Sequence, residues 1–251
     1  MRSWVKFALV VGCIWISVFA LFIFYYIKSL GVLRVPQEFS TIQEAINHAE
    51  RGSKIVVSKG IYNEHLIVNK SVSIIGEDKS ATIIDAGGVG IVVQVTADYV
   101  NISGFTIQNS CPDCYGLHVL SSSNCSFSDN IVTNNGRGIY IDRCTHITTK
   151  ANFVTNNHFG VSIINSANSI VRNNSLQANL YNLDVSGMHF PHYIQDIDSS
   201  NTADGKPIYY WVNEQNRQVP LDAAYVGVVN STNIVVKSLN LSRNYQGLLF
   251  A

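Results

Sequence analysis

Three features of the sequence predict an all-β fold in which the chain winds as a parallel β-helix: a 22-residue repeat, short alternating apolar runs, and many asparagines. The repeat is marked by one position at 22-residue spacing, held by Gly116, Gly138, Gly160 and Asn182. In each copy two apolar residues follow and flank a single residue, as Leu117 and Val119 do. Such alternation between asparagine-rich turns indicates strands. One repeat can form one coil of a solenoid, in which equivalent positions stack at about 4.8 Å.

The composition agrees with this fold and excludes other classes. Lys plus Arg (17) balances Asp plus Glu (17), so the formal net charge is zero. A neutral chain argues against nucleic-acid binding, which needs a basic surface. Charged residues are 14% and apolar residues 47%, which argues against a disordered chain. The 25 asparagines suit tight turns, because asparagine tolerates left-handed backbone angles.

The first 34 residues are predicted to form a separate targeting segment. Residues 7–27 contain no charge, and Tyr25 and Tyr26 stand at their outer end. About 20 apolar residues span a bilayer as a helix, whereas the apolar part of a signal peptide has roughly 7–15. We expect residues 7–27 to be a single-pass transmembrane anchor, with cleavage of a signal near Gly31 as the alternative. Both place residues 35–251 outside the cytosol.

A short helix is predicted to cap the first coil. Ser40 with Gln43 and Thr41 with Glu44 match the capping-box pattern of a helix start. The apolar residues that follow have the spacing of one helix face and are Ile42, Ala45, Ile46 and Ala49. A helix in this place covers an unpaired strand edge. Strands are then expected at about residues 54–58, 66–68, 72–75, 82–85 and 91–95.

The repeat predicts stacked side chains inside the solenoid. Asparagines recur in two registers, Asn130, Asn152 and Asn174, and Asn135, Asn157 and Asn179. Aliphatic residues share a third register, Val132, Val154 and Leu176. A further copy near the end places Leu241 on Val132 and Asn244 on Asn135. We expect the asparagine amides to hydrogen-bond from coil to coil.

Residues 184–226 interrupt the repeat. The segments 206–213 and 218–220 suggest a hairpin inserted into the solenoid. At the far end, residues 247–251 begin another coil with no capping helix after it. Further coils or a partner are therefore expected to cover that edge.

Two segments resemble a known family. Residues 35–77, VPQEFSTIQEAINHAERGSKIVVSKGIYNEHLIVNKSVSIIGE, resemble the opening of right-handed β-helix proteins of the NosD and carbohydrate-binding and sugar-hydrolysis (CASH) group. Pectin methylesterases and related polysaccharide enzymes begin similarly. Residues 195–251, from QDIDSSNTADGKPIYYW onward, resemble NosD-like surface proteins. The resemblance implies the right-handed form of the β-helix and is weak for activity, because this fold supports lyases, hydrolases, esterases, epimerases and binders.

Carbohydrate-binding candidates lie on the outer strand face and in the interrupting segment. The outward positions between the apolar pairs are His118, Tyr140, Ser162 and Asp184, with Asp142 beside them. An aromatic ring beside polar groups suits a sugar surface, although an ordinary polar exterior gives the same pattern. Tyr209, Tyr210 and Trp211 offer a second stacking platform, unless they pack in the core.

Metal and disulfide candidates also stand out. His189, His192, Asp196 and Asp198 form the densest ligand-like cluster, for which the resemblance to NosD suggests copper and the acidic spacing suggests calcium. HxxH in a loop is a loose pattern, so packing or turn capping is the competing interpretation. Cys111 and Cys114 are close enough in sequence for a short-loop disulfide outside the cytosol.

These observations predict an extracytoplasmic, membrane-anchored module that binds carbohydrate or another surface without turnover. The motifs of methylesterase and polygalacturonase active sites are absent from the sequence. A polysaccharide-active enzyme (lyase, hydrolase or epimerase) on the outer strand face is the first alternative. A periplasmic copper-handling factor like NosD is the second. The expected partners are a polysaccharide or glycoconjugate and, through residues 7–27, a membrane.

Overall fold

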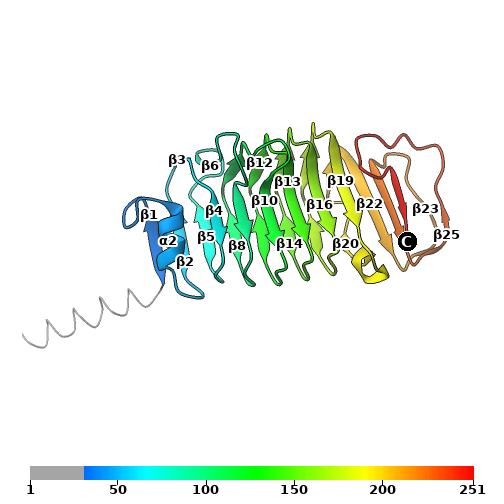
Figure 1. The fold of residues 1–251 in the computed structure, drawn as a ribbon. Helices are drawn as coiled ribbons and strands as arrows, with labels where there is room; N and C mark the ends of the chain where they lie inside the picture. Colours follow the sequence, from blue (N-terminus) through cyan, green and yellow to red (C-terminus); the bar gives the residue numbers. More distant parts are fainter. Residues whose placement is uncertain (1–30) are drawn as a thin grey trace, which may run out of the picture. The chain divides into compact units, whose positions relative to one another are not determined.

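The computed structural model describes residues 31–251, which form a parallel β-helix (Figure 1). The predicted anchor at residues 7–27 lies outside the described residues. Among residues 31–251, no helix has both the length and the apolar character needed to span a bilayer.

Three sheets run along the solenoid. Regular coils contribute one strand to each sheet, whereas the coils after residue 203 continue only sheet B. Sheet A contains β1 (Val32–Val35), β2 (Lys54–Val57), β5 (Ser73–Gly76), β8 (Asn101–Ser103), β11 (Ser126–Ser128), β14 (Thr148–Lys150), β17 (Ile170–Arg172) and β20 (Asp196–Ile197). Sheet C contains β4 (Leu66–Val68), β7 (Val93–Val95), β10 (Tyr115–Leu120), β13 (Arg137–Asp142), β16 (Phe159–Ile164) and β19 (Tyr181–Ser186).

Sheet B contains β3 (Gly60–Tyr62), β6 (Thr82–Asp85), β9 (Thr106–Gln108), β12 (Ile131–Thr133), β15 (Phe153–Thr155), β18 (Ser175–Gln177), β21 (Thr202–Ala203), β22 (Lys206–Val212), β24 (Tyr225–Val229) and β26 (Leu248–Phe250). A separate pair joins β23 (Gln215–Gln218) to β25 (Thr232–Val235). The remaining elements are the helix α2 (Ile42–His48) and the 3-10 helix η1 (Phe190–Tyr193).

The predicted coil register is confirmed. Ile139 pairs with Val161, and Val161 pairs with Leu183. These side chains are buried and form a ladder inside the solenoid. β10, β13, β16 and β19 therefore lie side by side in parallel, one coil apart (Figure 1).

The asparagine registers form the expected ladders. The Oδ1 atom of Asn157 accepts hydrogen bonds from the backbone N–H (2.9 Å) and Nδ2 (3.1 Å) of Asn135. Asn157 in turn donates from the same two groups to Oδ1 of Asn179 (3.0 and 3.1 Å). The second register repeats this pattern through Asn130, Asn152, Asn174 and Asn201. All these amides are buried, so the ladders satisfy polar groups that water does not reach.

The ladders stand at corners where the backbone adopts left-handed angles. In each regular coil four residues have φ between 48° and 56°, at the positions of Ser121, Asn124, Asp129 and Asn134 and their equivalents at 22-residue spacing. A buried residue follows each corner directly, as Asn135 follows Asn134. The left-handed corner thus turns the next side chain inward. Asparagine is the residue other than glycine that tolerates this backbone best, which accounts for its abundance.

Gly138 is required by the closeness of the next coil. A Cβ atom there would lie 2.7 Å from the carbonyl oxygen of Gly160 and 3.0 Å from Nδ2 of Asn157. Asn182 occupies the equivalent position in the last regular coil, where its Oδ1 accepts a hydrogen bond from Asn179 (3.0 Å). The ladder therefore ends on the side chain that replaces the glycine.

The predicted helix is present at the start of the solenoid. Thr41 is its N-cap and accepts a hydrogen bond from the N–H of Glu44 (3.1 Å), whose carboxylate reaches back to the N–H of Ser40 (3.0 Å). The carboxylate of Glu64 accepts from the N–H groups of Ile42 and Gln43 (2.9 Å each). The apolar face of α2 is buried in the main core.

The prediction of a hairpin between the segments 206–213 and 218–220 is wrong. β22 does not pair with residues 218–220 but runs parallel to β24 in the next coil. Tyr209 pairs with Val226 and Gln215 with Thr232, so the repeat here is 17 residues. The segment therefore continues the winding with a shorter coil, after one tight antiparallel turn between β21 and β22. A 22-residue period does not reveal this coil, because its equivalent residues are 17 positions apart.

Candidate functional site

The outer face of sheet C carries the row of polar and aromatic residues expected from the sequence. His118 pairs with Tyr140, Tyr140 with Ser162, and Ser162 with Asp184, each in the next coil. The parallel pairing therefore sets these four side chains in a line across four strands. Asp142 lies two residues after Tyr140 on β13 and points to the same side of the sheet.

A second row of this face was not singled out from the sequence. It consists of the residues that precede the repeat-marking position by one, namely Tyr115, Arg137, Phe159 and Tyr181. The rings contact one another across coils: the centroids of Tyr115 and Tyr140 are 4.8 Å apart, and those of Phe159 and Tyr181 are 5.1 Å apart. An alignment of the repeats shows aromatic or cationic residues at this position in each copy, which is the signal that could have revealed the row.

The C-terminal segment extends the face. Residues 243–246 lie along β19, because the N–H of Asn182 donates to the carbonyl of Arg243 (2.6 Å) and the N–H of Tyr245 to that of Leu183 (3.4 Å). The Tyr245 ring is 5.8 Å from Phe159 and 6.0 Å from Tyr181. These residues cover the β19 edge of sheet C. The expectation that further coils or a partner cover the edge at residues 247–251, where β26 is the last strand of sheet B, stays a prediction. The seven residues that form the combined surface, here called the aromatic face, are Tyr115, His118, Arg137, Tyr140, Phe159, Tyr181 and Tyr245.

Arg137 stands at the centre of the aromatic face. Its guanidinium carbon is 5.8, 5.1 and 4.9 Å from the ring centroids of Tyr115, Tyr140 and Phe159. Within residues 31–251 no carboxylate forms an ion pair with Arg137, and the neighbouring Asp142 pairs with Arg143 (3.1 Å). The face thus presents a positive charge that aromatic rings hold in place and that the described chain does not neutralise.

The two buried ionisable groups of the face favour their neutral forms. Burial raises the pKa of Asp184, whose Oδ1 accepts a hydrogen bond from Nε2 of Gln246 (3.0 Å). Burial also lowers the pKa of His118, whose Nδ1 has no hydrogen-bond partner and whose ring stacks on Tyr115 (4.3 Å). Both shifts have the same main cause, since burial disfavours the charged form of each group.

The predicted aromatic platform at residues 209–211 does not form. Tyr210 is 5% exposed and donates its hydroxyl proton to the carbonyl of Tyr193 (2.6 Å). Trp211 is 9% exposed and packs in a small cluster with Val219, while Arg217 covers its ring at 4.2 Å. Both residues therefore serve packing, and only Tyr209 keeps partial exposure.

The four predicted metal ligands do not assemble into one site. The rings of His189 and His192 lie 5.5 Å apart on the exposed η1 turn. Asp196 and Asp198 both form ion pairs with Arg172, the latter at 3.0 Å. In the part of the chain from 31 to 251, no three His, Cys, Asp or Glu side chains are grouped to hold a metal ion. The acidic spacing that suggested calcium instead places the two carboxylates around Arg172.

A cavity of about 340 Å³ is lined by residues from both the predicted metal cluster and the predicted aromatic platform. Asp196 and Asp198 line it opposite Tyr209, Trp211 and Arg217. Its charges have partners within the chain, since Arg217 pairs with Glu214 (3.0 Å) and the two aspartates pair with Arg172. The cavity therefore offers a ligand fewer unpaired groups than the aromatic face does.

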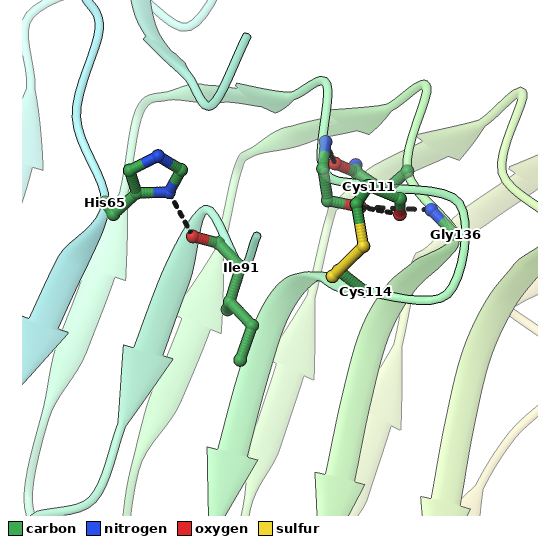
Figure 2. The surroundings of a disulfide bond; sticks show 7 residues. His65, Ile91, Cys111, Cys114 and Gly136 are labelled. Carbon is green, nitrogen blue, oxygen red and sulfur yellow. Dashed lines mark hydrogen bonds between the residues drawn. A yellow bond between two sulfur atoms is a disulfide. The ribbon is translucent and has the colours of Figure 1, made fainter. Parts of the chain in front are cut away.

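Cys111 and Cys114 are joined by a disulfide at the entrance to β10 (Figure 2). The carbonyl of Cys114 accepts a hydrogen bond from the N–H of Arg137 (2.8 Å). Cys125 and Cys144 are buried free thiols. The disulfide thus lies beside the first residues of both strands that supply the centre of the aromatic face.

Comparisons with known proteins show the same architecture. Residues 88–250 match a family model described as "Right handed beta helix region". A crystal structure of a pectin methylesterase mutant in complex with a hexasaccharide is 16% identical, with a TM-score of 0.50 over 57% of this chain and 52% of that one. ORF18 of Geobacillus virus E2 is 19% identical, with a TM-score of 0.54 over 85% of this chain and 48% of that one. No curated protein matches the sequence.

At identities of 16% and 19%, the similarity to these two solved structures shows a shared fold and nothing about activity. The aligned region spans about half the length of each of them.

Proposed function

The chain belongs to the right-handed β-helix family, and from that premise we propose that its aromatic face binds a polysaccharide. The single observation that carries the proposal is the contiguous set of partly exposed rings around Arg137, which forms no ion pair within residues 31–251. Sugar rings have apolar C–H faces that pack on aromatic rings, and this contact is strong for its size. The similarity to a pectin methylesterase whose structure contains a hexasaccharide is compatible with this role.

Arg137 favours an acidic polysaccharide over a neutral one. A guanidinium forms bidentate hydrogen bonds with carboxylate or sulfate groups, and its fork is already oriented by the surrounding rings. No ion pair within residues 31–251 competes for it. The polymer would run along the solenoid, because the rings of four neighbouring strands extend for about 15 Å in that direction.

The contacts of Asp142 and Asp184 support binding of the polysaccharide without its chemical conversion. General acid and base catalysis needs groups free to exchange protons with a substrate. Asp184 is buried and engaged by Gln246, and Asp142 is engaged by Arg143. A catalytic role, the alternative, would appear as release of reducing ends or unsaturated products from the polymers tested below.

An extracytoplasmic location completes the proposal. Disulfides persist in oxidising compartments, and the Cys111–Cys114 bond suits such a setting. The membrane anchor proposed for residues 7–27 would hold the module at a cell surface.

Titration calorimetry with polygalacturonate tests the aromatic face. Tyr140→Ala and Phe159→Ala should each weaken binding about tenfold, since one aromatic contact is worth about 1 kcal/mol or more. Tyr99→Ala is the matched control, because Tyr99 is 60% exposed on a corner outside the aromatic face. Equal affinity of all three variants and the parent chain would contradict the proposal.

A second comparison tests the charge. Methyl esterification removes the charge of polygalacturonate while keeping its linkages, so the parent chain should bind the acidic polymer about tenfold more tightly. Arg137→Gln should abolish that preference. A preference retained by Arg137→Gln would show that another group recognises the acid.

A further inference from the structure

The Cys111–Cys114 disulfide closes a local expansion of the repeat. Ser110 and Asn135 occupy equivalent corners, since the N–H of Ser110 donates to Oδ1 of Asn135 (3.0 Å). Tyr115 and Arg137 are paired strand residues. The coil that contains β10 therefore takes five residues to pass from this corner to the strand, from Ser110 to Tyr115. The next coil takes only two, from Asn135 to Arg137. The disulfide holds the ends of the additional loop together, with a Cα separation of 4.9 Å.

The loop is tied to the next coil at the point where the aromatic face begins. The N–H of Gly136 donates to Oγ of Ser110 (3.1 Å), and the N–H of Arg137 donates to the carbonyl of Cys114 (2.8 Å). Figure 2 shows Gly136 next to the disulfide. The cross-linked loop thus positions the backbone from which the side chain of Arg137 extends.

Tyr115 directly follows Cys114 and is the first ring of the aromatic face. It contacts His118 at 4.3 Å and Tyr140 at 4.8 Å. Its ring also forms one wall of the cage around Arg137, at 5.8 Å. Motion of the loop would therefore displace Arg137 in two ways, through the hydrogen bond that its N–H donates to the Cys114 carbonyl and through the ring of Tyr115.

We infer that the Cys111–Cys114 pair is a redox switch for the affinity of the aromatic face; the inference rests on the proposed function. A thiolate of a dithiol reductant, either a small molecule or a protein, attacks one sulfur atom, and the S–S bond breaks as a mixed disulfide forms. The second thiol of the reductant then attacks the reductant's own sulfur in the mixed disulfide and displaces the cysteine that was bound there. The reductant loses two electrons and becomes a disulfide, while Cys111 and Cys114 become two thiols. Both cysteines are partly exposed, which gives the reductant access.

Hydrogen exchange measured on the oxidised and reduced chain tests the switch without any ligand. Reduction should speed amide exchange in residues 115–120 and 136–138 about tenfold, since the closed loop no longer restricts them. Exchange in β16, two coils away from the loop, should stay unchanged. Identical exchange in the oxidised and reduced states would overturn the inference.

Binding of polygalacturonate provides the second readout. The reduced chain should bind about tenfold more weakly than the oxidised one. Cys111→Ser/Cys114→Ser should show the weaker affinity with and without reductant. Cys125→Ser/Cys144→Ser is the matched control, because it keeps the disulfide and should keep the response. Both registers already hold serine: Ser122 and Ser166 in that of Cys144, and Ser169 in that of Cys125.

The two readouts separate the inference from the proposed function. If the oxidised chain binds no polysaccharide while exchange still responds to reduction, the proposed function fails and the loop remains a redox-sensitive element of the face. If the oxidised chain binds and reduction changes neither affinity nor exchange, the switch is refuted while the binding function stands.

Discussion

Replacing Asn157 with alanine should weaken the solenoid at its middle. Asn157 is 4% exposed and lies between Asn135 and Asn179 in the ladder. Its side chain takes part in five hydrogen bonds, two accepted from Asn135 and three donated to Val132, Thr155 and Asn179. The substitution removes them all and leaves the backbone N–H of Asn135 buried without an acceptor.

The loss can be estimated from these contacts. An orphaned buried N–H costs about 1–3 kcal/mol, and a typical hydrogen bond contributes about 1 kcal/mol net. The Nδ2 group of Asn135 still donates to the carbonyls of Ile107 and Thr133, so the hydrogen bond that it loses to Asn157 costs little. We expect the free energy of unfolding to fall by about 3 kcal/mol. For a chain of this size the melting temperature should fall by about 9 °C.

Thermal unfolding followed by circular dichroism measures the effect. Asn156→Ala is the control, because Asn156 is exposed and its register is held by alanine at Ala178, with φ of 53°. That variant should stay within about 1 kcal/mol of the parent chain. If the two variants melt at the same temperature, the ladder does not contribute as argued.

Two further predictions concern the coil interface and the buried carboxyl. Gly138→Ala should lower the free energy of unfolding by about 1–3 kcal/mol, because the new Cβ would meet the carbonyl of Gly160 at 2.7 Å; Gly247→Ala, with 3.9 Å to its nearest atom, should be neutral in urea titration, and equal losses would refute the steric argument. Burial raises the pKa of Asp184 above its ordinary 3.8, so the folded chain binds this proton more tightly than the unfolded chain. The free energy of unfolding therefore falls as the pH rises from the pKa of the unfolded chain through that of the folded chain. Asp184→Asn removes this loss, so its melting temperature relative to the parent should be higher at pH 7 than at pH 3.5, and a difference independent of pH would contradict the assignment.

The repeat could be predicted from the sequence because the coil imposes a constraint that recurs. Asn135 and Asn157 must be asparagine for one reason, the buried amide ladder, and that reason applies in each coil. Residues 204–235 escaped prediction because a tight turn is followed by a coil of only 17 residues. A fixed period cannot detect such a change, although the Asn213 and Asn230 side chains still pair across the shorter coil (2.5 Å).

The candidate site was predicted only in part. The row from His118 to Asp184 followed from strand alternation alone. Arg137 was missed because its importance comes from rings on neighbouring coils and from the pairing of Asp142 with Arg143, both of which depend on tertiary structure. For Trp211 the sequence left both a stacking platform and core packing open, because it does not reveal what packs on an aromatic residue; in the structure Trp211 is buried.

The coil also fixes the distance between equivalent side chains along the solenoid. Each added winding advances a side chain by one strand spacing, about 4.8 Å, along a straight line. Moving a chemical group by 22 positions in the sequence therefore shifts it by one fixed increment without altering its orientation. Exchanging Arg137 and Phe159 would displace the positive charge by one such increment. The spacing of charges along a bound polymer could in this way be matched by counting residues rather than by redesigning a pocket.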